Sequence, residues 1–253
     1  MRIERFSEDM TEFEDTSWIS DEFTRHYLLI ADAQIPQRSR LKKIIGSFYR
    51  FHAPIGDNPV VLDLGSGDGA MAAALLGVDP NIKPVLVDAS EEMINRAKRR
   101  LSACLPCLFI KRSFHELIEY NDDIPPCDFV VSSLAIHHID TSEKERLIRF
   151  IYEKLKPGGW FLLYDTVLPP SSLEEWYINL WLEWIRNQKE KKGIDEDMES
   201  FVFDHHQAPD HHKNIDSLET HLSLLGKTGF SKIDIVYKYG IFTLLCGERP
   251  DHS

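Results

Sequence analysis

The residues best placed to do chemistry form a short run of alternating glycines. Val60 to Leu64 is an apolar, β-branched run, and Gly65, Gly67 and Gly69 follow it directly. An apolar run of this length bounded by glycines is typical of a buried parallel strand. Glycines let the backbone turn sharply and approach a ligand closely, because they carry no Cβ. Ala70 to Leu76 then predicts a helix whose free N–H groups face that ligand.

The charges beside these glycines narrow the choice of ligand. The G-x-G-x-x-A run that begins at Gly65 fits the dinucleotide-binding fingerprint, with Asp88 available for a ribose hydroxyl. Asp68 would repel an anion at the N-terminus of the following helix, whereas Asp63 and Asp68 together would attract a cationic amino-acid group. The acidic turn therefore favours a ligand with a cationic end and a ribose over a nicotinamide dinucleotide.

Two adjacent histidines are the candidates for proton transfer. His137 and His138 follow a predicted strand over Cys127 to Ser132, and ligands of open α/β sheets bind at the carboxyl ends of the strands. Imidazole titrates near neutral pH, so either histidine could be a general base. The alternative is that one of them only fixes its loop or contacts the cofactor. Asp165, at the end of a predicted strand over Trp160 to Tyr164, is a further candidate.

Two other patterns could bind metal. Asp204-His205-His206 and Asp210-His211-His212 offer imidazole and carboxylate groups of the kind that zinc, iron or manganese takes. Histidines in loops are more often solvated, so we assign no metal and expect this loop to border the acceptor. The Cys104-x-x-Cys107 pair has redox or zinc spacing, but no second pair completes a four-thiolate site. We expect these two cysteines to be structural.

The composition indicates a water-soluble globular chain. The 253 residues are 43% hydrophobic and 28% charged, and the net charge is −12. That charge argues against a protein that grips nucleic acid over its whole surface, because phosphate binding requires clustered Lys and Arg. No apolar signal core and no membrane-spanning run of about 18 residues is found. The sequence therefore predicts a cytoplasmic protein.

The elements that must position these residues alternate between strands and helices. Further strands are predicted over residues 84–88 and 108–111, and helices follow Ser90, Phe114 and a capping box at Ser142-x-x-Glu145. A turn is expected at Pro157-Gly158-Gly159. Strands that alternate with helices in this way predict a parallel sheet covered on both faces.

Helices are expected on both sides of this core in the sequence. Two precede the glycine strand, one with Phe23 and Tyr27 on its apolar face and one opened by Pro36. Arg38 in the second could reach a carboxylate, or could be a surface arginine without such a role. A long aromatic helix begins at Ser171 or Ser172 and runs through Trp176 to Ile185. It could line an acceptor pocket or belong to the core.

The C-terminal part predicts a helix and a hairpin. Ser217 to Thr228 is expected to be helical and to end at Gly229, which suits a helix C-terminus. Residues 233–237 and 241–246 are expected to form two antiparallel strands, with the turn at Tyr239-Gly240.

In order and spacing, these motifs resemble one family over most of the chain. Leu62 to Gly69 resembles the first motif of the class I S-adenosylmethionine-dependent methyltransferases, and Asp88 matches their ribose-binding acid. Ser133 to His138 is similar to the motif after their fourth strand, and Leu155 to Gly159 matches the turn before their fifth. The last part of the chain is similar to small-molecule members, and more distantly to enzymes that modify the tRNA wobble uridine.

The resemblance implies a fold and a set of site residues. The expected fold is a Rossmann-like, doubly wound, mostly parallel seven-stranded sheet with a C-terminal antiparallel hairpin and a helical cap. His137 and His138 are the expected catalytic residues. The cofactor residues implied by the resemblance are Asp63, Gly65, Ser66, Gly67, Asp88, Ala89, Met93, Ser113, Phe114 and Ser133. Ser113-Phe114 departs from the family, which often has an acid or amide there for the adenine amine; the serine hydroxyl or the Phe114 backbone could substitute.

The resulting prediction is an enzyme that moves a methyl group from S-adenosyl-L-methionine to a small molecule. The alternatives are a tRNA-modifying methyltransferase, a related S-adenosylmethionine-derived group transferase, and a non-catalytic cofactor-binding module. A homodimer is considered as an assembly. The expected division is N-terminal cap helices over residues 1–55, a cofactor-binding core over 56–168, a helical insertion with the histidine-rich loop over 169–214, and a core-completing helix and hairpin over 215–253.

Overall fold

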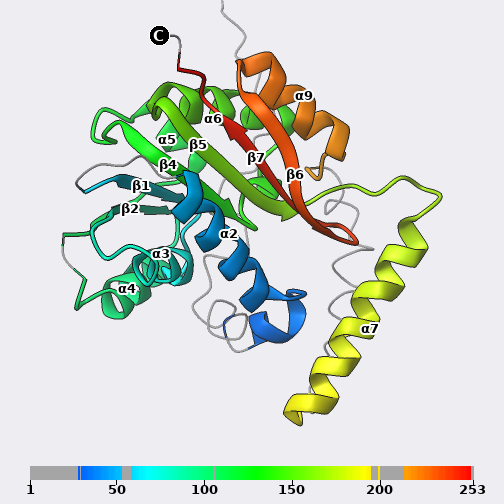
Figure 1. Ribbon diagram of the computed structural model, residues 1–253. Coiled ribbons are helices and arrows are strands. Elements are labelled where there is room, and N and C mark those ends of the chain that lie inside the picture. Colours follow the sequence, from blue (N-terminus) through cyan, green and yellow to red (C-terminus); the bar gives the residue numbers. More distant parts are fainter. Residues whose placement is uncertain are drawn as a thin grey trace, which may run out of the picture.

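A seven-stranded sheet is the centre of the computed structural model, which describes residues 28, 30–52, 58–104, 106–194, 199 and 214–251 (Figure 1). The strands are β1 (Val60–Leu64), β2 (Lys83–Asp88), β3 (Leu108–Lys111), β4 (Cys127–Ser133), β5 (Leu155–Thr166), β6 (Ser231–Tyr239) and β7 (Phe242–Glu248). Their order is β3-β2-β1-β4-β5-β7-β6. The first five strands are parallel, and β7 pairs antiparallel with both β5 and β6. The predicted fold class, including the terminal antiparallel hairpin, is confirmed.

Helices cover both faces of this sheet, as the strand–helix alternation requires (Figure 1). On one face lie α2 (Arg38–His52), α3 (Ala70–Leu76) and α4 (Glu91–Arg100). On the other lie α5 (Phe114–Glu119), α6 (Thr141–Lys154) and α9 (Leu218–Thr228). A short 3-10 turn, η3 (Ile136–His138), follows β4. The long helix α7 (Glu174–Lys192) extends away from the edge of the sheet.

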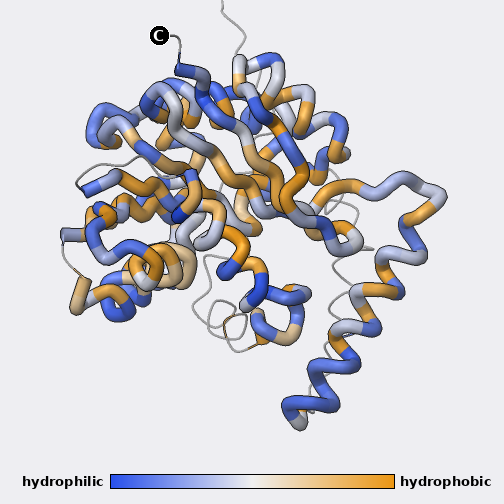
Figure 2. Tube along the Cα trace, viewed as in Figure 1, coloured by the Kyte–Doolittle hydropathy of each residue, from blue (hydrophilic) through white to orange (hydrophobic). Residues whose placement is uncertain are grey.

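Alternate residues of each strand supply the two halves of the core. Leu162 and Tyr164 of β5 face α2 and α7, whereas Phe161 and Leu163 face α6 and α9. This alternation is the period of two that a strand imposes on its side chains. Apolar residues accordingly follow the sheet, and hydrophilic residues mark the far end of α7 (Figure 2). In the part of the chain that the structure describes, no helix is long and apolar enough to cross a membrane.

The start of α6 differs from the prediction. Its capping box is formed by Asp140 and Glu143, not by Ser142 and Glu145. The Asp140 carboxylate accepts from Glu143 N at 2.9 Å, and the Glu143 carboxylate accepts from Asp140 N at 3.0 Å. Both pairs fit the three-residue spacing of a capping box, and aspartate is a strong N-cap.

The Pro157-Gly158-Gly159 turn is also placed differently. It is a bulge inside β5, where the pairing with β4 changes register, and not a turn before the strand. Gly158 N donates to Arg249 O, and Arg249 N donates to Gly159 O, both at 2.8 Å. These bonds to the end of β7 hold the segment in the sheet.

The remaining differences concern the ends of elements. The aromatic helix α7 begins at Glu174, later than predicted, after a turn that includes Ser171 and Ser172. Pro36 lies in a turn that precedes α2 and does not open the helix. The predicted helical face with Phe23 and Tyr27 and the histidine-rich loop over 204–212 lie outside the described residues.

Candidate active site

A pocket opens at the carboxyl ends of β1, β2 and β4, where the strand order reverses between β1 and β4. Ligands of doubly wound sheets bind at such a switch point. The loops after these strands and after β3 line the pocket, and α2 closes it from one side. All ten residues that the family resemblance suggested for the cofactor line this pocket: Asp63, Gly65, Ser66, Gly67, Asp88, Ala89, Met93, Ser113, Phe114 and Ser133.

The glycine turn after β1 has a backbone that only glycine adopts without strain. The φ angles of Gly65, Gly67 and Gly69 are +65°, +54° and +76°. A Cβ on Gly65 would lie 2.2 Å from the Cβ of Ala135, in the loop after β4. Among the residues that the structure describes, a Cβ on Gly67 would have only Met93 Sδ nearby, at 4.0 Å, and it would take up pocket space. The absence of a side chain therefore lets the Ala135 side chain lie against the backbone of Gly65, and it leaves space for a ligand at Gly67.

Asp88 binds the turn from the end of β2. Its Oδ2 accepts from Gly67 N and its Oδ1 accepts from Ser90 N, both at 2.8 Å. Burial raises the pKa of Asp88 to about 6, although these two N–H groups favour the charged form. The carboxylate keeps lone pairs that hydroxyl donors such as those of a ribose could use.

Asp63 is the buried acid at the base of the turn. It is 1% exposed, and its Oδ2 accepts from Ala72 N at 3.2 Å. Burial raises its pKa to about 7, with a smaller contribution in the same direction from Asp88 and Asp68. Asp68 itself pairs with the Arg100 guanidinium, so it is less available to a ligand than the sequence suggested. A cationic ligand would stabilise the charged form of Asp63.

Two serines in the pocket differ in what their hydroxyls can do. Within the described residues, Ser66 Oγ is buried and has no hydrogen-bond partner, which is costly unless a ligand or water supplies one. The Ser113 hydroxyl is engaged in the capping box of α5, since it accepts from Glu116 N at 3.2 Å and lies 3.0 Å from the Glu116 carboxylate. Ser66 is thus the better candidate to bind a ligand through its hydroxyl.

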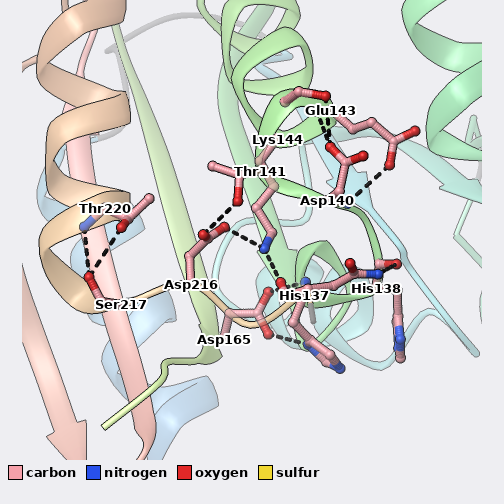
Figure 3. A network of polar contacts seen from close by, with 12 residues as sticks. His137, His138, Asp140, Thr141, Glu143, Lys144, Asp165, Asp216, Ser217 and Thr220 are labelled. Carbon is pink, nitrogen blue, oxygen red and sulfur yellow. Dashed lines mark hydrogen bonds and ion pairs between the residues drawn. The ribbon is translucent and has the colours of Figure 1, made fainter. Parts of the chain in front are cut away.

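The two histidines of η3 have different surroundings (Figure 3). His138 lines the pocket, and His137 does not. His137 Nδ1 lies 2.5 Å from Asp165 Oδ1, and His137 N donates to Asp165 Oδ2 at 3.0 Å. Burial alone would raise the pKa of Asp165, but the charge of His137 and its hydrogen bond outweigh burial and lower it. The two imidazoles lie side by side, with ring centroids 4.1 Å apart.

A second set of hydrogen-bonded polar residues, on α6 and in the segment before α9, anchors the loop that contains η3 (Figure 3). The fully buried Lys144 ammonium bonds to Asp216 Oδ2 at 2.7 Å and to the carbonyl of Asn214. Asn214 Nδ2 donates to His138 O at 3.0 Å, and Thr141 Oγ1 donates to Asp216 Oδ1 at 2.7 Å. The main chain of His138 is therefore anchored to α6 and to the segment before α9.

Several pocket residues were not assigned a cofactor or catalytic role from sequence. Leu134 lines the pocket with φ +54° and donates its N–H to Tyr164 O at 2.8 Å. It lies in the Ser133 to His138 motif, but no sequence signal predicts its conformation, which leucine rarely adopts. Lys42 and Arg112 also line the pocket, and helix periodicity alone could have placed Lys42 one turn after Arg38.

The aromatic helix does not line the pocket. Trp181 Nε1 donates to Gln34 O at 2.7 Å, and Trp184 Nε1 donates to Ala33 O at 2.9 Å. Trp176 is 59% exposed. Trp181 thus belongs to the hydrophobic core, and no residue of α7 lines the pocket.

Known proteins share this arrangement. Residues 61–159, from β1 to the bulge in β5, match the family model described as a methyltransferase domain. This match, in the expected fold, identifies residues 61–159 as a methyltransferase domain of the class I S-adenosylmethionine-dependent type. Its cofactor is S-adenosyl-L-methionine, and the sequence-based assignments of family, enzyme class and cofactor are confirmed. The pocket fits this cofactor, since it offers the orphaned Ser66 hydroxyl, the open cradle at Gly67 and the buried acids Asp63 and Asp88.

Individual relatives of this methyltransferase differ in how much of it they match. A carboxy-S-adenosyl-L-methionine synthase of Nautilia profundicola is 25% identical over 193 residues, which are 74% of this chain and 76% of that protein. An acetylserotonin O-methyltransferase of Gallus gallus is 31% identical over 108 residues, which are 43% of this chain and 30% of that protein. An O-methyltransferase family structure from Burkholderia thailandensis superposes with a TM-score of 0.65 at 15% identity. It matches 95% of this chain, which spans 63% of that longer protein, and shows the likeness of fold.

Proposed function

We propose that the enzyme methylates a small molecule that binds between the glycine turn and α2. When bound, S-adenosylmethionine supplies an activated methyl group, and displacement by an acceptor lone pair leaves S-adenosylhomocysteine. The observation that carries the proposal is the composition of the pocket beyond the glycine turn. Leu28, Ile35 and Leu41 line it there, and His138 and Ile139 line it from the loop after β4. An apolar wall with a few polar groups suits a small organic ligand.

The roles of the chain's own residues follow from this arrangement. The glycine turn, Asp63 and Asp88 bind and orient the cofactor, and the apolar wall excludes water from the acceptor. Alignment and desolvation are the main needs of a displacement from an activated donor. His138 lines the pocket and accepts the proton of an acceptor that must lose one, whereas Asp165 holds His137 behind it. His137 is thus a positioning residue in this proposal.

The assignment of a role to His138 is tested by two matched substitutions. For an acceptor with an ionisable proton, His138→Asn should lower kcat by roughly 10²- to 10⁴-fold, the range for general acid–base catalysis, with little change in cofactor affinity. His137→Asn should act mainly on stability, because it removes the imidazole that is hydrogen-bonded to the buried Asp165 carboxylate. Steady-state kinetics and cofactor titration measure both. Equal kcat values for wild type and His138→Asn would contradict the role of a base.

The proposed function as a whole is tested by following the methyl group. The protein is incubated with S-adenosylmethionine that carries a tritiated methyl, together with either the small-molecule fraction of a cell extract or total tRNA. We expect tritium in a small product and none in RNA. Tritium in tRNA, or no transfer to the small-molecule fraction, would overturn the proposal.

A second candidate reaction uses the same cofactor. Similarity to the carboxy-S-adenosyl-L-methionine synthase covers 74% of the chain, whereas similarity to acetylserotonin O-methyltransferase covers 43%. The name of the former describes a product in which the cofactor itself is carboxylated. Mass spectrometry of the adenosyl product separates the two reactions, since methyl transfer gives S-adenosylhomocysteine and the synthase reaction gives a heavier carboxylated sulfonium.

Other assignments remain sequence-based predictions. They are a cytoplasmic location, a homodimer, the four-part division at residues 55, 168 and 214, and the expectation that nucleic acid is not a partner. Fractionation, light scattering and the tRNA incubation above test them.

A further inference from the structure

Helix α2 presents two cationic side chains to the pocket, one helical turn apart. Arg38 and Lys42 both line it, together with the acids Asp63 and Asp88. The sequence drew attention to Arg38 as a candidate to bind a carboxylate. In the structure, Arg38 Nη1 instead donates to Asp32 Oδ1 at 2.7 Å, so a carboxylate of the chain already occupies it.

Lys42 is the pocket cation without such a partner. Within the described residues it makes no ion pair and no hydrogen bond, although it is partly buried. Arg112, the third permanent cation of the pocket, is taken by Asp123 at 2.7 and 3.2 Å and by the carbonyl of Tyr120. Among the permanent cations of the pocket that the structure describes, Lys42 is therefore the one whose charge is not paired with a carboxylate.

The electrostatic surroundings of Lys42 point the same way. Burial lowers the pKa of Lys42, and the neighbouring Arg38 lowers it further, while Asp32 and Asp68 act in the opposite direction. An ammonium held partly out of water beside another cation is unfavourable unless an anion joins it. A ligand carboxylate would supply that anion with charge-assisted hydrogen bonds.

We propose that Lys42 is the carboxylate-binding residue of this pocket. The proposal rests on the proposed function, because it assigns one group of the ligands to one residue of the same site. Two ligands of that site can carry the carboxylate: the methionine end of the cofactor, and an acidic acceptor. Lys42 and Asp63 would then bind opposite charges of a ligand in the same pocket, which orients a zwitterionic ligand there.

The first measurement asks whether the carboxylate belongs to the cofactor. Calorimetry compares S-adenosylmethionine with its decarboxylated analogue for wild type, Lys42→Met, Lys42→Arg and Lys43→Met. Lys43 is the matched control, because it is the exposed neighbour on the same helix and does not line the pocket. If Lys42 binds the cofactor, wild type should prefer the carboxylated form by about tenfold or more, the factor for a hydrogen bond to a charged group. Lys42→Met should lose this preference and Lys42→Arg should largely keep it.

The second measurement asks whether the carboxylate belongs to the acceptor. Benzoate, phenylacetate and their uncharged amides are titrated into each variant saturated with S-adenosylhomocysteine. If Lys42 binds an acidic acceptor, wild type should bind the acids more tightly than the amides, and Lys42→Met should not. If Lys42→Met behaves as Lys43→Met does with every ligand, the proposal is wrong. Failure of the proposed function would differ, since wild type would then transfer no methyl group whatever the behaviour of Lys42.

Discussion

At the scale of single residues, Gly65 meets two separate constraints. Its φ of +65° disfavours any L side chain, and a Cβ there would lie 2.2 Å from Ala135 Cβ. Gly193 has nearly the same backbone, with φ +63°, but a Cβ there would meet none of the described residues within 4 Å. An alanine substitution at Gly193 therefore reports the energetic cost of the backbone conformation alone, whereas the same substitution at Gly65 adds the cost of the clash with Ala135.

We expect Gly65→Ala to be much more damaging than Gly193→Ala. The change at Gly193 should cost about 1 kcal/mol of unfolding free energy, the usual penalty for a left-handed non-glycine residue. The change at Gly65 should cost several kcal/mol more, or displace the loop of Ala135 and abolish cofactor binding. Denaturant unfolding and calorimetry measure both effects. Similar losses of stability and affinity in the two variants would show that the contact with Ala135 is unimportant.

Asp63 couples cofactor binding to pH. Its pKa is raised from 3.8 to about 7, so much of it is protonated in the ligand-free protein below neutrality. A cationic ligand requires the carboxylate, so binding releases a proton. Affinity for S-adenosylmethionine should rise about fivefold between pH 6 and 7, about twofold more by pH 8, and level off above that. Asp63→Asn should bind more weakly and lack this step, whereas an unchanged slope would show that another group titrates. Calorimetry across pH measures it.

The same group should lower the stability of the ligand-free protein as pH rises. The unfolded chain ionises first, near pH 4, so the folded state loses relative stability from there up to the folded pKa of about 7. Asp63→Asn should therefore raise the unfolding free energy of the ligand-free protein at pH 8 by about 4 kcal/mol, which denaturant unfolding measures.

Sequence could predict the residues of the glycine turn, because glycine spacing and β-branched strands reflect local backbone geometry. It did not indicate the backbone conformation of Leu134, which depends on a hydrogen bond to a different strand. For Arg38 it suggested a ligand role, but could not show that Asp32 occupies the guanidinium, since that pairing depends on the fold of the segment between them.

At the scale of elements, α7 is attached to the site through its tryptophans. The indoles of Trp181 and Trp184 bind the carbonyls of Gln34 and Ala33, and the adjacent Ile35 lines the pocket. A helix that projects from the sheet thereby helps to fix one wall of the site.

Removing the buried indole donor should disturb both stability and binding. Trp181→Phe should cost about 1–3 kcal/mol of unfolding free energy, because it leaves a buried carbonyl without its donor. It should also weaken cofactor binding, since the segment with Ile35 loses its support. Trp176→Phe, at a position that is 59% exposed, is the control and should change stability by less than about 0.5 kcal/mol. Equal urea midpoints for the two variants would contradict this role of α7.

Apolar periodicity in the sequence predicts most of the helices and strands, but it predicts the residues at which they begin and end less well. The start of α6 shows why: two overlapping capping boxes fit the same sequence, and the spacing alone does not choose between Asp140 and Ser142. The bulge at Gly158 depends on bonds to Arg249, which lies far along the chain and leaves no local signal.

At the scale of the whole molecule, the net charge of −12 contrasts with a pocket that contains both signs of charge. We therefore expect the charges inside the pocket, and not the net charge of the protein, to decide which ligands bind. Saturating S-adenosylmethionine, at about 100 times its Kd, should stabilise the protein by about 2.7 kcal/mol and raise Tm by about 5–10 °C. Transfer RNA should leave Tm unchanged. Differential scanning fluorimetry measures both, and a rise with tRNA would contradict the prediction.

The antiparallel strand β7 has a consequence for synthesis on the ribosome. It pairs with β5 from Trp160↔Glu248 to Thr166↔Phe242, so one side of β5 has no neighbour until β7 has been made. The nascent chain thus carries the apolar residues Trp160 to Tyr164 along an open strand edge while α7 and α9 are still being translated. An open apolar edge pairs readily with other chains. We therefore expect chaperone contact on emerging chains to be concentrated in the interval between the synthesis of β5 and that of β7.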